Sequence, residues 1–156
     1  MVFPHVTFEG DVALGEMIVA AEWAEAIGGV FEQLFEAPYP IEQIALVDHF
    51  GGDDQASMRA DNTSAFNCRE VAGRPGVWSN HAFGTAVDVN PLRNPFVRGG
   101  SIDPPEGATF ADRSNVRQGM IVDGDAAVMA FESIGWVWGG NWQNGRDYQH
   151  FSANGR

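Results

Sequence analysis

The sequence predicts an α+β domain with a largely antiparallel sheet and flanking helices. Two segments have the character of helices, and several short runs between glycine and proline turns have the character of strands. These segments do not alternate as repeating βαβ units, and no internal repeat is visible. That order favours an α+β arrangement over a parallel α/β sheet.

One long helical segment and one shorter segment are expected. The first runs from Gly15 to Phe35, where apolar residues recur at helical spacing and glutamate and glutamine residues lie between them. The pair Gly28-Gly29 can kink or split this run, since paired glycines are unfavourable inside a helix. The second helix is expected to begin at Asp123 and to end at Gly135.

Five short segments are expected to be strands because they combine β-branched, aromatic or small residues and are bounded by turn-forming residues. They are Ile41–Phe50, Thr63–Val71, Thr85–Val89, Trp136–Trp138 and Tyr148–Ser152. A polar stretch that ends at Asn62 is expected to contain a helical turn. The residues Pro91–Asp112 show no periodicity and predict a long surface excursion, which often borders a site.

Composition indicates a single domain, residues 1–156, in which 44% hydrophobic residues can fill one core. The formal net charge of −12 argues against a basic face for phosphates, so nucleic acid is not an expected partner. No run approaches the roughly 18 apolar residues of a membrane span, and no signal peptide is recognised. We expect a monomer, with the single cysteine, Cys68, buried.

Two segments contain histidine and aspartate residues that together suit a metal. His81 and Asp88 lie in Ser79–Pro91, and His150 follows Asp147 near the end of the sequence. Two imidazole nitrogens and one carboxylate oxygen form a set that zinc accepts, with a fourth position left for water as in catalytic zinc sites. Spacing alone does not distinguish such ligands from ordinary polar residues that satisfy one another.

The complete motifs are more specific than the spacing. The pattern Ser-x-His-x-x-Gly-x-Ala-x-Asp-x-Asn, with Asp-x-x-His-Phe far downstream, resembles the zinc peptidases of the D-alanyl-D-alanine carboxypeptidase and L-alanyl-D-glutamate endopeptidase family. The resemblance covers roughly Ile41–Phe151 and includes Asp61–Arg69, Asn90–Pro95 and Gly135–Gly140. It implies the hedgehog/DD-peptidase-like fold that this family shares with the hedgehog signalling domain.

The resemblance also implies a role for each motif residue. His81, Asp88 and His150 are expected to hold Zn²⁺, and Asp147 is expected to be the catalytic acid/base. Arg69 is expected to bind a substrate carboxylate or the developing oxyanion. A surface ion pair between Arg69 and a neighbouring acid remains the alternative.

Three further residues border these motifs. Arg59 would replace Arg69 if that segment is displaced relative to the family pattern. Ser79 is expected to contact substrate, or to hydrogen-bond to the backbone or to a ligand histidine. Trp142 is expected to line the cleft and contact substrate, although a place in the core is also open.

General chemistry gives Asp147 a specific task. Bound zinc lowers the pKa of its water to about 7, and a nearby carboxylate can take the water's proton and later protonate the leaving amine. Asp147 lies three residues before His150, and residues three apart on a straight strand point to opposite faces. We therefore expect Asp147 in a bend before the strand that carries His150.

The expected function is zinc-dependent hydrolysis of an amide bond in peptidoglycan stem peptides, by a D,D-carboxypeptidase or an endopeptidase. The alternative is a non-catalytic zinc-bearing domain that recognises the cell wall, although such a domain needs no proton shuttle like Asp147. A lysostaphin-type enzyme is disfavoured because the sequence has no His-x-His pair. The substrate implies action at the cell wall outside the cytoplasm, or storage in the cytoplasm until lysis if the protein is a phage endolysin.

Overall fold

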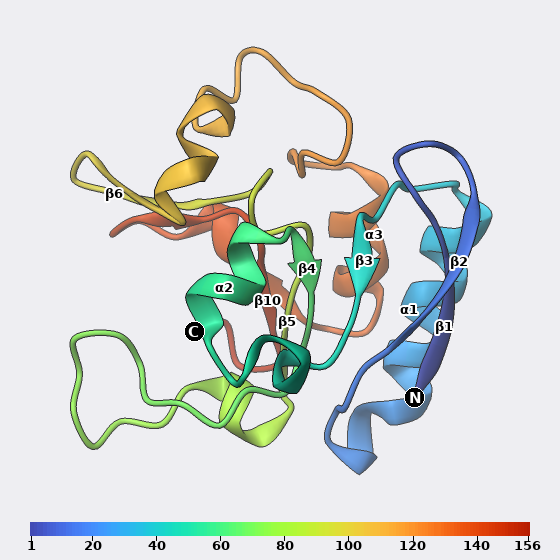
Figure 1. Ribbon diagram of the computed structural model, residues 1–156, viewed down its shortest axis with the longest axis horizontal. Coiled ribbons are helices and arrows are strands. Elements are labelled where there is room, and N and C mark those ends of the chain that lie inside the picture. Colours follow the sequence, from blue (N-terminus) through green and yellow to red (C-terminus); the bar gives the residue numbers. More distant parts are fainter.

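The computed structural model describes residues 1–156, with a hairpin and two helices on one side and short strands on the other (Figure 1). The elements of the first side are β1 (Val2–Val6), β2 (Val12–Glu16), α1 (Ala24–Glu36) and α3 (Ala126–Ser133). β1 and β2 pair antiparallel, and α1 packs against both the hairpin and α3. No helix is both long and apolar enough to cross a membrane.

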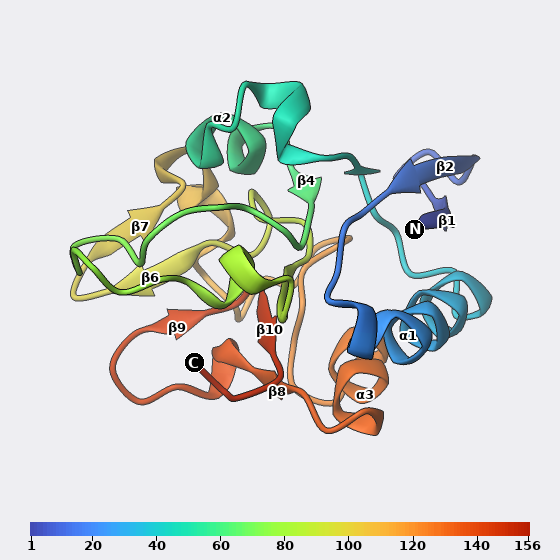
Figure 2. The same cartoon turned by 90° about the horizontal axis from the view of Figure 1, so that it is seen from below.

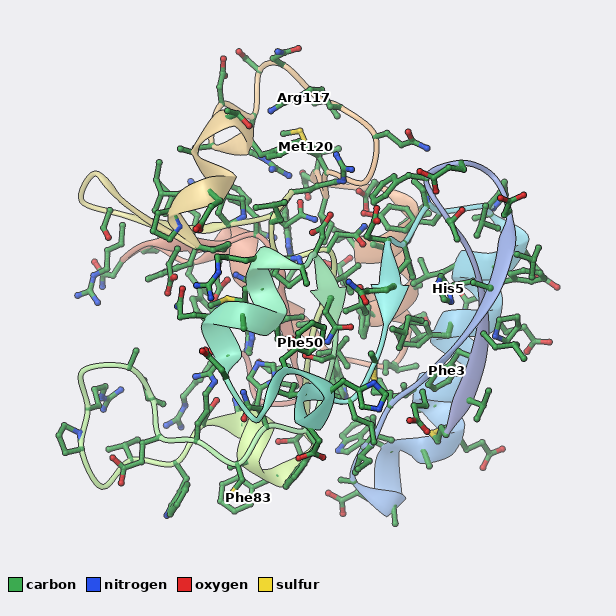
Figure 3. All side chains as sticks on the ribbon, in the orientation of Figure 1. Phe3, His5, Phe50, Phe83, Arg117 and Met120 are labelled. Atoms are coloured by element: carbon green, nitrogen blue, oxygen red, sulfur yellow. The ribbon has the colours of Figure 1, made fainter.

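The helix α1 buries one stripe of residues. These residues are Ile27, Val30, Phe31 and Leu34. Their spacing of three, one and three residues places them on one face of the helix. From this face Phe31 contacts Phe3 of β1 at 4.5 Å between ring centroids, with the Phe3 side chain directed inward (Figure 3), and it meets Phe131 of α3 edge-on at 6.5 Å.

A three-stranded antiparallel sheet lies at the centre of the other side (Figure 2). Its strands, in order, are β5 (Ala86–Asp88), β10 (His150–Ser152) and β8 (Val137–Trp138). Asp88 lies opposite His150, and Val87 lies opposite Phe151. The Phe151 ring stacks on Phe131 at 4.1 Å, so the aromatic core holds the residue next to His150 in place.

A two-stranded sheet and a second three-stranded sheet flank the central one. Their strands are β3 (Gln43–Ile44) with β4 (Asn62–Thr63), and β7 (Ser101–Asp103), β6 (Phe96–Arg98) and β9 (Arg146–Asp147). The first pair is parallel, and the other pairings are antiparallel. The remaining helices are η1 (Ala21–Trp23), η2 (Val47–Phe50), α2 (Asp54–Arg59), η3 (Asn80–Phe83), η4 (Pro105–Phe110) and η5 (Gly139–Asn141).

The expected class, mixed helices and mainly antiparallel strands in a small domain, is confirmed. Strands in the predicted Thr85–Val89, Trp136–Trp138 and Tyr148–Ser152 segments are confirmed in shorter form, and the helical turn before Asn62 is α2.

The prediction for the first helix was wrong at its start. The helix α1 begins at Ala24 rather than Gly15, because Gly15 and Glu16 belong to β2, which pairs with β1, and the first helical turn is η1 from Ala21. A Cβ atom at Gly15 would lie only 2.3 Å from the Cβ of Ile44, so this glycine permits close packing of β2 on β3. The pair Gly28-Gly29 lies inside α1 and does not split it.

The strands predicted at Ile41–Phe50 and Thr63–Val71 are much shorter than expected. Beyond Ile44, the Asn62 side chain accepts a hydrogen bond from Ala45 N and donates one to Ala45 O. This side chain takes the place of a neighbouring strand, and the backbone then turns into η2.

Two further expectations need correction. The excursion Pro91–Asp112 contains η4 and the β6–β7 hairpin. The residues of this hairpin show no hydrophobic periodicity from which the strand pairing could be predicted. Cys68 is exposed rather than buried. Its segment runs along the surface beside η3, where Asn67 N donates to His81 O.

The turn after η3 generates a stability prediction, with the turn after η2 as a matched control. Gly84 and Gly51 each end a short helix with φ of +65° and +68°, but a Cβ at Gly84 would lie 2.6 Å from Ala20 N, whereas nothing lies within 4 Å of one at Gly51. Gly51→Ala should lower the free energy of unfolding by about 1 kcal/mol, the cost of a left-handed alanine. Gly84→Ala should lower it by about 3 kcal/mol or more in urea titrations, since the clash adds to that cost. Equal losses would contradict this packing argument.

Candidate metal centre and active site

Three buried side chains converge on one point where η3, β5 and β10 meet. His81 Nε2 lies 3.2 Å from His150 Nδ1 and 3.2 Å from Asp88 Oδ2. His150 Nδ1 lies 3.0 Å from Asp88 Oδ1. The exposed fractions of the three residues are 3%, 6% and 7% for His81, His150 and Asp88. The group could hold a metal ion.

Local structure fixes each of these residues. His81 lies in η3, whose first turn is capped by Ser79 Oγ, which accepts a hydrogen bond from His81 N at 3.3 Å. Asp88 and His150 are brought together by strand register, since they are direct partners across β5 and β10. Ser64 also bridges Asp88 through two backbone hydrogen bonds.

Backbone carbonyls select the nitrogen that each histidine directs at the site. His81 Nδ1 lies 2.7 Å from Ala65 O, and His150 Nε2 lies 3.0 Å from Arg156 O. A carbonyl oxygen only accepts, so each of these nitrogens carries the proton and donates it. The lone pairs of His81 Nε2 and His150 Nδ1 therefore face each other beside a carboxylate. Three acceptors at such short range are satisfied by a metal ion between them or by an added proton on an imidazole. Burial by itself would lower the pKa of His150, but Asp88 raises this pKa in favour of that proton when no metal is bound.

The spacing of the three groups fits zinc. A tetrahedral ion with bonds of about 2.0–2.1 Å needs donor atoms about 3.3 Å apart. The observed separations of 3.0–3.2 Å are close to that value. Burial by itself would raise the pKa of the Asp88 carboxyl, but the two histidines hold this pKa well below its usual range. Asp88 is therefore a carboxylate, the form that binds metal.

Asp147 lies beside this group without joining it. It is the last residue of β9, and a two-residue turn separates it from β10, in agreement with the bend expected before His150. A Cβ atom at Gly139 would lie 2.9 Å from the Cβ of Asp147 and 3.3 Å from that of His150. The two side chains therefore flank the same glycine.

The carboxyl group of Asp147 is electrostatically unusual. Burial raises its pKa to about 7, and the charge of Asp88 acts in the same direction. Positive charge on His150 and Arg69 opposes the rise. The Oδ1 atom is buried and has no hydrogen-bond partner. A carboxyl group that titrates near neutral pH can both accept and donate a proton.

Arg69 lies on the segment that runs beside η3, with Ser79 N donating to Arg69 O at 3.1 Å. Its Nε is 3.0 Å from Asp54 Oδ2, so the predicted alternative of an ion pair is present. The same carboxylate accepts a hydrogen bond from Asn67 at 2.8 Å. Because Asp54 binds the Nε edge, the terminal Nη atoms of Arg69 stay available to a ligand.

The other predicted residues lie in different settings. Ser79 is buried as the cap of η3, and its contact with substrate stays a prediction. The Trp142 ring packs on the imidazole of His150 at 5.3 Å between centroids, and its contact with substrate stays a prediction. Arg59 is exposed at the end of α2. Of the two arginines, it is Arg69 whose charge lowers the pKa of Asp147.

Several supporting residues were not predicted from the sequence. Asp54 forms an ion pair with Arg69, and Asn80 and Asn154 hydrogen-bond to each other beside His81. Such contacts join positions far apart in the chain and leave no short motif. Arg146 and Tyr148 line a cavity of about 290 Å³.

Comparison with known proteins gives one family. The family model described as D-alanyl-D-alanine carboxypeptidase matches residues 72–153, which is 82 of 156 residues. No curated protein and no solved structure matches the chain. The matched segment contains the His-Asp-His group and Asp147, while Arg69 lies just before it.

A buried His-Asp-His group beside a carboxylate is the kind of centre that metal-dependent hydrolases use. The chain belongs to the D-alanyl-D-alanine carboxypeptidase family of zinc peptidases, as the sequence motifs indicated. Membership of this family implies a metallopeptidase.

The convergence of the three donors generates a metal-binding prediction. The protein should bind about one zinc ion per chain, and His81→Ala or His150→Ala should weaken binding by at least 100-fold, because each removes one of three protein ligands. Elemental analysis and competition titration with a chromophoric chelator would measure this. His49→Ala is the matched control, since His49 is 60% exposed and pairs only with Glu16. Equal zinc affinity in all four proteins would contradict the assignment.

Proposed function

We propose that this protein is a zinc-dependent peptidase that hydrolyses an amide bond in peptidoglycan stem peptides. The observation that carries the proposal is the placement of Asp147, with a buried and unpaired carboxylate oxygen, next to three buried groups that could hold a metal. A purely structural zinc site has no use for such a neighbour. The family membership supports the substrate class.

The ligand residues have defined roles in this proposal. His81 through Nε2, His150 through Nδ1 and Asp88 through its carboxylate would hold Zn²⁺. When bound, the ion supplies Lewis acidity toward the scissile carbonyl and makes water acidic enough to act as a nucleophile near pH 7. The hydrogen bonds to Ala65 O and Arg156 O keep both imidazoles in the correct tautomer for this task.

Asp147 moves the protons. Its carboxylate accepts a proton from the attacking water and then donates one to the leaving nitrogen, because an amine leaves far more readily than its anion. Burial raises the pKa of this group toward neutrality, which balances the two tasks. Gly139 has no side chain to separate Asp147 from His150, so the Asp147 carboxylate can lie close to the metal-binding group.

Arg69 supplies fixed positive charge. Its Nη atoms donate to the oxyanion that develops at the scissile carbonyl, or to a terminal carboxylate of the substrate. Asp54 holds the guanidinium by its Nε edge, and Asn67 holds Asp54 in turn. Trp142 packs beside His150 and keeps bulk water from that side of the site.

The proposal extends to the whole chain. Residues 1–156 form one zinc peptidase domain of the hedgehog/DD-peptidase type, acting as a monomer. Its place of action follows from the substrate: the cell wall outside the cytoplasm, with cytoplasmic storage before lysis if the protein is a phage endolysin. The reaction is that of a D,D-carboxypeptidase or of an endopeptidase.

Replacement of Asp147 tests the catalytic proposal. Asp147→Asn keeps the shape but cannot accept a proton, so turnover of muropeptides should fall by about 10²–10⁴-fold while zinc content stays the same. Release of new amino groups and elemental analysis on the same preparations measure both. Asp11→Asn, exposed in the β1–β2 turn, is the matched control and should have no effect. Unchanged turnover in Asp147→Asn would remove this residue from the mechanism, and zinc-loaded protein inactive on all stem peptides would favour a recognition domain.

The pair Asp54 and Arg69 generates a prediction about substrate type. Arg69→Ala should lower kcat/KM by about 10²–10³-fold if the guanidinium stabilises the oxyanion, for carboxylate-ended and amide-capped stem peptides alike. If it binds a terminal carboxylate instead, the loss should be confined to the carboxylate-ended peptide. Asp54→Asn should give the same pattern more weakly, because the guanidinium loses its orientation.

Arg59→Ala is the control for this series, since it removes an exposed arginine of α2 only five residues from Asp54. Steady-state kinetics on the two peptides would measure all four proteins. An Arg69→Ala variant with unchanged kcat/KM on both peptides would show that the ion pair with Asp54 is its whole role.

A further inference from the structure

The residues that follow β10 turn back beside the proposed metal centre. Figure 2 shows the end of the chain reversing direction next to β10. Arg156 N donates to Ser152 Oγ at 3.1 Å and to Asn154 Oδ1 at 3.1 Å, which closes this turn. The turn places Arg156 O at 3.0 Å from His150 Nε2. A carbonyl from outside the sheet thus receives the proton of one ligand histidine.

A pair of asparagine side chains holds the turn against the other ligand segment. Asn80 Nδ2 donates to Asn154 Oδ1 at 2.8 Å, and Asn154 Nδ2 donates back to Asn80 Oδ1 at 3.0 Å. Asn80 Nδ2 donates to Arg156 O as well. Asn80 is the first residue of η3 and directly precedes His81. The Asn80 amide therefore contacts Arg156 O, which orients His150, and Asn80 is itself the chain neighbour of His81.

We infer that Asn80 and Asn154 are positioning residues of the metal centre, which fix the tautomer of His150 and tie the two histidine-bearing segments together. The inference rests on the proposed metal site. With the bridge in place, Arg156 O accepts from His150 Nε2 and leaves Nδ1 free to bind the ion. Without the bridge, the turn loses its attachment to η3, the carbonyl moves away, and either nitrogen of His150 can carry the proton.

A role in general folding would give a different signature. Hydrogen bonds between these two side chains lie at the surface, where water can replace either partner, so their loss changes the free energy of unfolding little. Phe83, at the other end of η3, points outward and is 60% exposed (Figure 3), so its side chain does not contact the metal-binding group. The bridge therefore acts where the ligands are.

Zinc affinity separates these possibilities. Asn154→Ala and Asn80→Ala should each weaken zinc binding by about 10- to 100-fold, the usual effect of losing a group that orients a metal ligand. The double variant should lose no more than the larger single loss, because the two amides act as one unit. Competition titration measures the affinity, and urea unfolding of the zinc-free proteins should give midpoints close to that of the unmutated protein.

Two further variants complete the test. Asn154→Asp keeps the acceptor for Asn80 Nδ2 and Arg156 N but places an oxygen against Asn80 Oδ1, so it should weaken zinc binding less than Asn154→Ala does. Asn115→Ala, exposed in the loop after η4, should leave zinc affinity unchanged. The visible absorption of the cobalt-substituted Asn154→Ala protein should differ from that of the unmutated protein, since the coordination of His150 changes.

The outcomes are distinguishable. Zinc affinity and cobalt spectra of Asn154→Ala that equal those of the unmutated protein would overturn this inference alone. Failure of the unmutated protein to bind zinc would overturn both the inference and the proposed function. Should Asn80→Ala fail to fold, the two Asn154 variants decide the matter.

Discussion

The register of β5 against β10 is the constraint on which the site depends. Asp88 and His150 are direct partners across these strands, and a slip of β10 by one residue would turn His150 to the face opposite Asp88. A buried carboxylate without a partner would cost several kcal/mol, but here the two histidines lie within 3.2 Å of it. The pairing therefore makes burial of the charge tolerable and gathers the metal-binding atoms in the same step.

The aromatic core protects this register. Phe151 stacks on Phe131 of α3, and Phe131 in turn meets Phe31 of α1. A slip of β10 would pull Phe151 out of this stack and leave a cavity, which typically costs 3–5 kcal/mol for a phenylalanine. The N-terminal hairpin, α1 and α3 are thus connected to the chemistry, although none of them supplies a residue of the metal-binding group.

The metal-binding residues and Asp147 could be predicted from the sequence more accurately than the helices and strands around them. The ligand triad and Asp147 belong to short motifs in which residue type and spacing are visible, and the structure brings the three ligands within reach of one ion. Their assigned roles stay predictions. Helix α1 was mislocated at its start because Gly15 serves in a strand against Ile44, a contact that helical periodicity cannot reveal.

Contacts between distant segments account for most of what the sequence could not show. Asn62 ends β3 by bonding to Ala45, and Asp54 holds Arg69 across 15 positions of sequence. The partner of an asparagine or aspartate cannot be predicted from spacing in the sequence, since both residues form turns, helix caps and long-range hydrogen bonds. Only the folded chain distinguishes an asparagine that shapes a site from one that ends a strand.

The excursion after β5 contributes to the chemistry through β6. Phe96 is the register partner of Asp147, and its ring occupies the space next to Gly145, so β6 covers the strand that carries the acid/base. Arg113 ties this region together by donating to Asn94 and by lying over the Tyr148 ring at 4.4 Å. Because burial is the main cause of the raised pKa of Asp147, a looser excursion would admit water and return that pKa toward its ordinary value. The excursion, whose sequence shows no periodicity, therefore contributes to the burial of Asp147, the proposed proton shuttle.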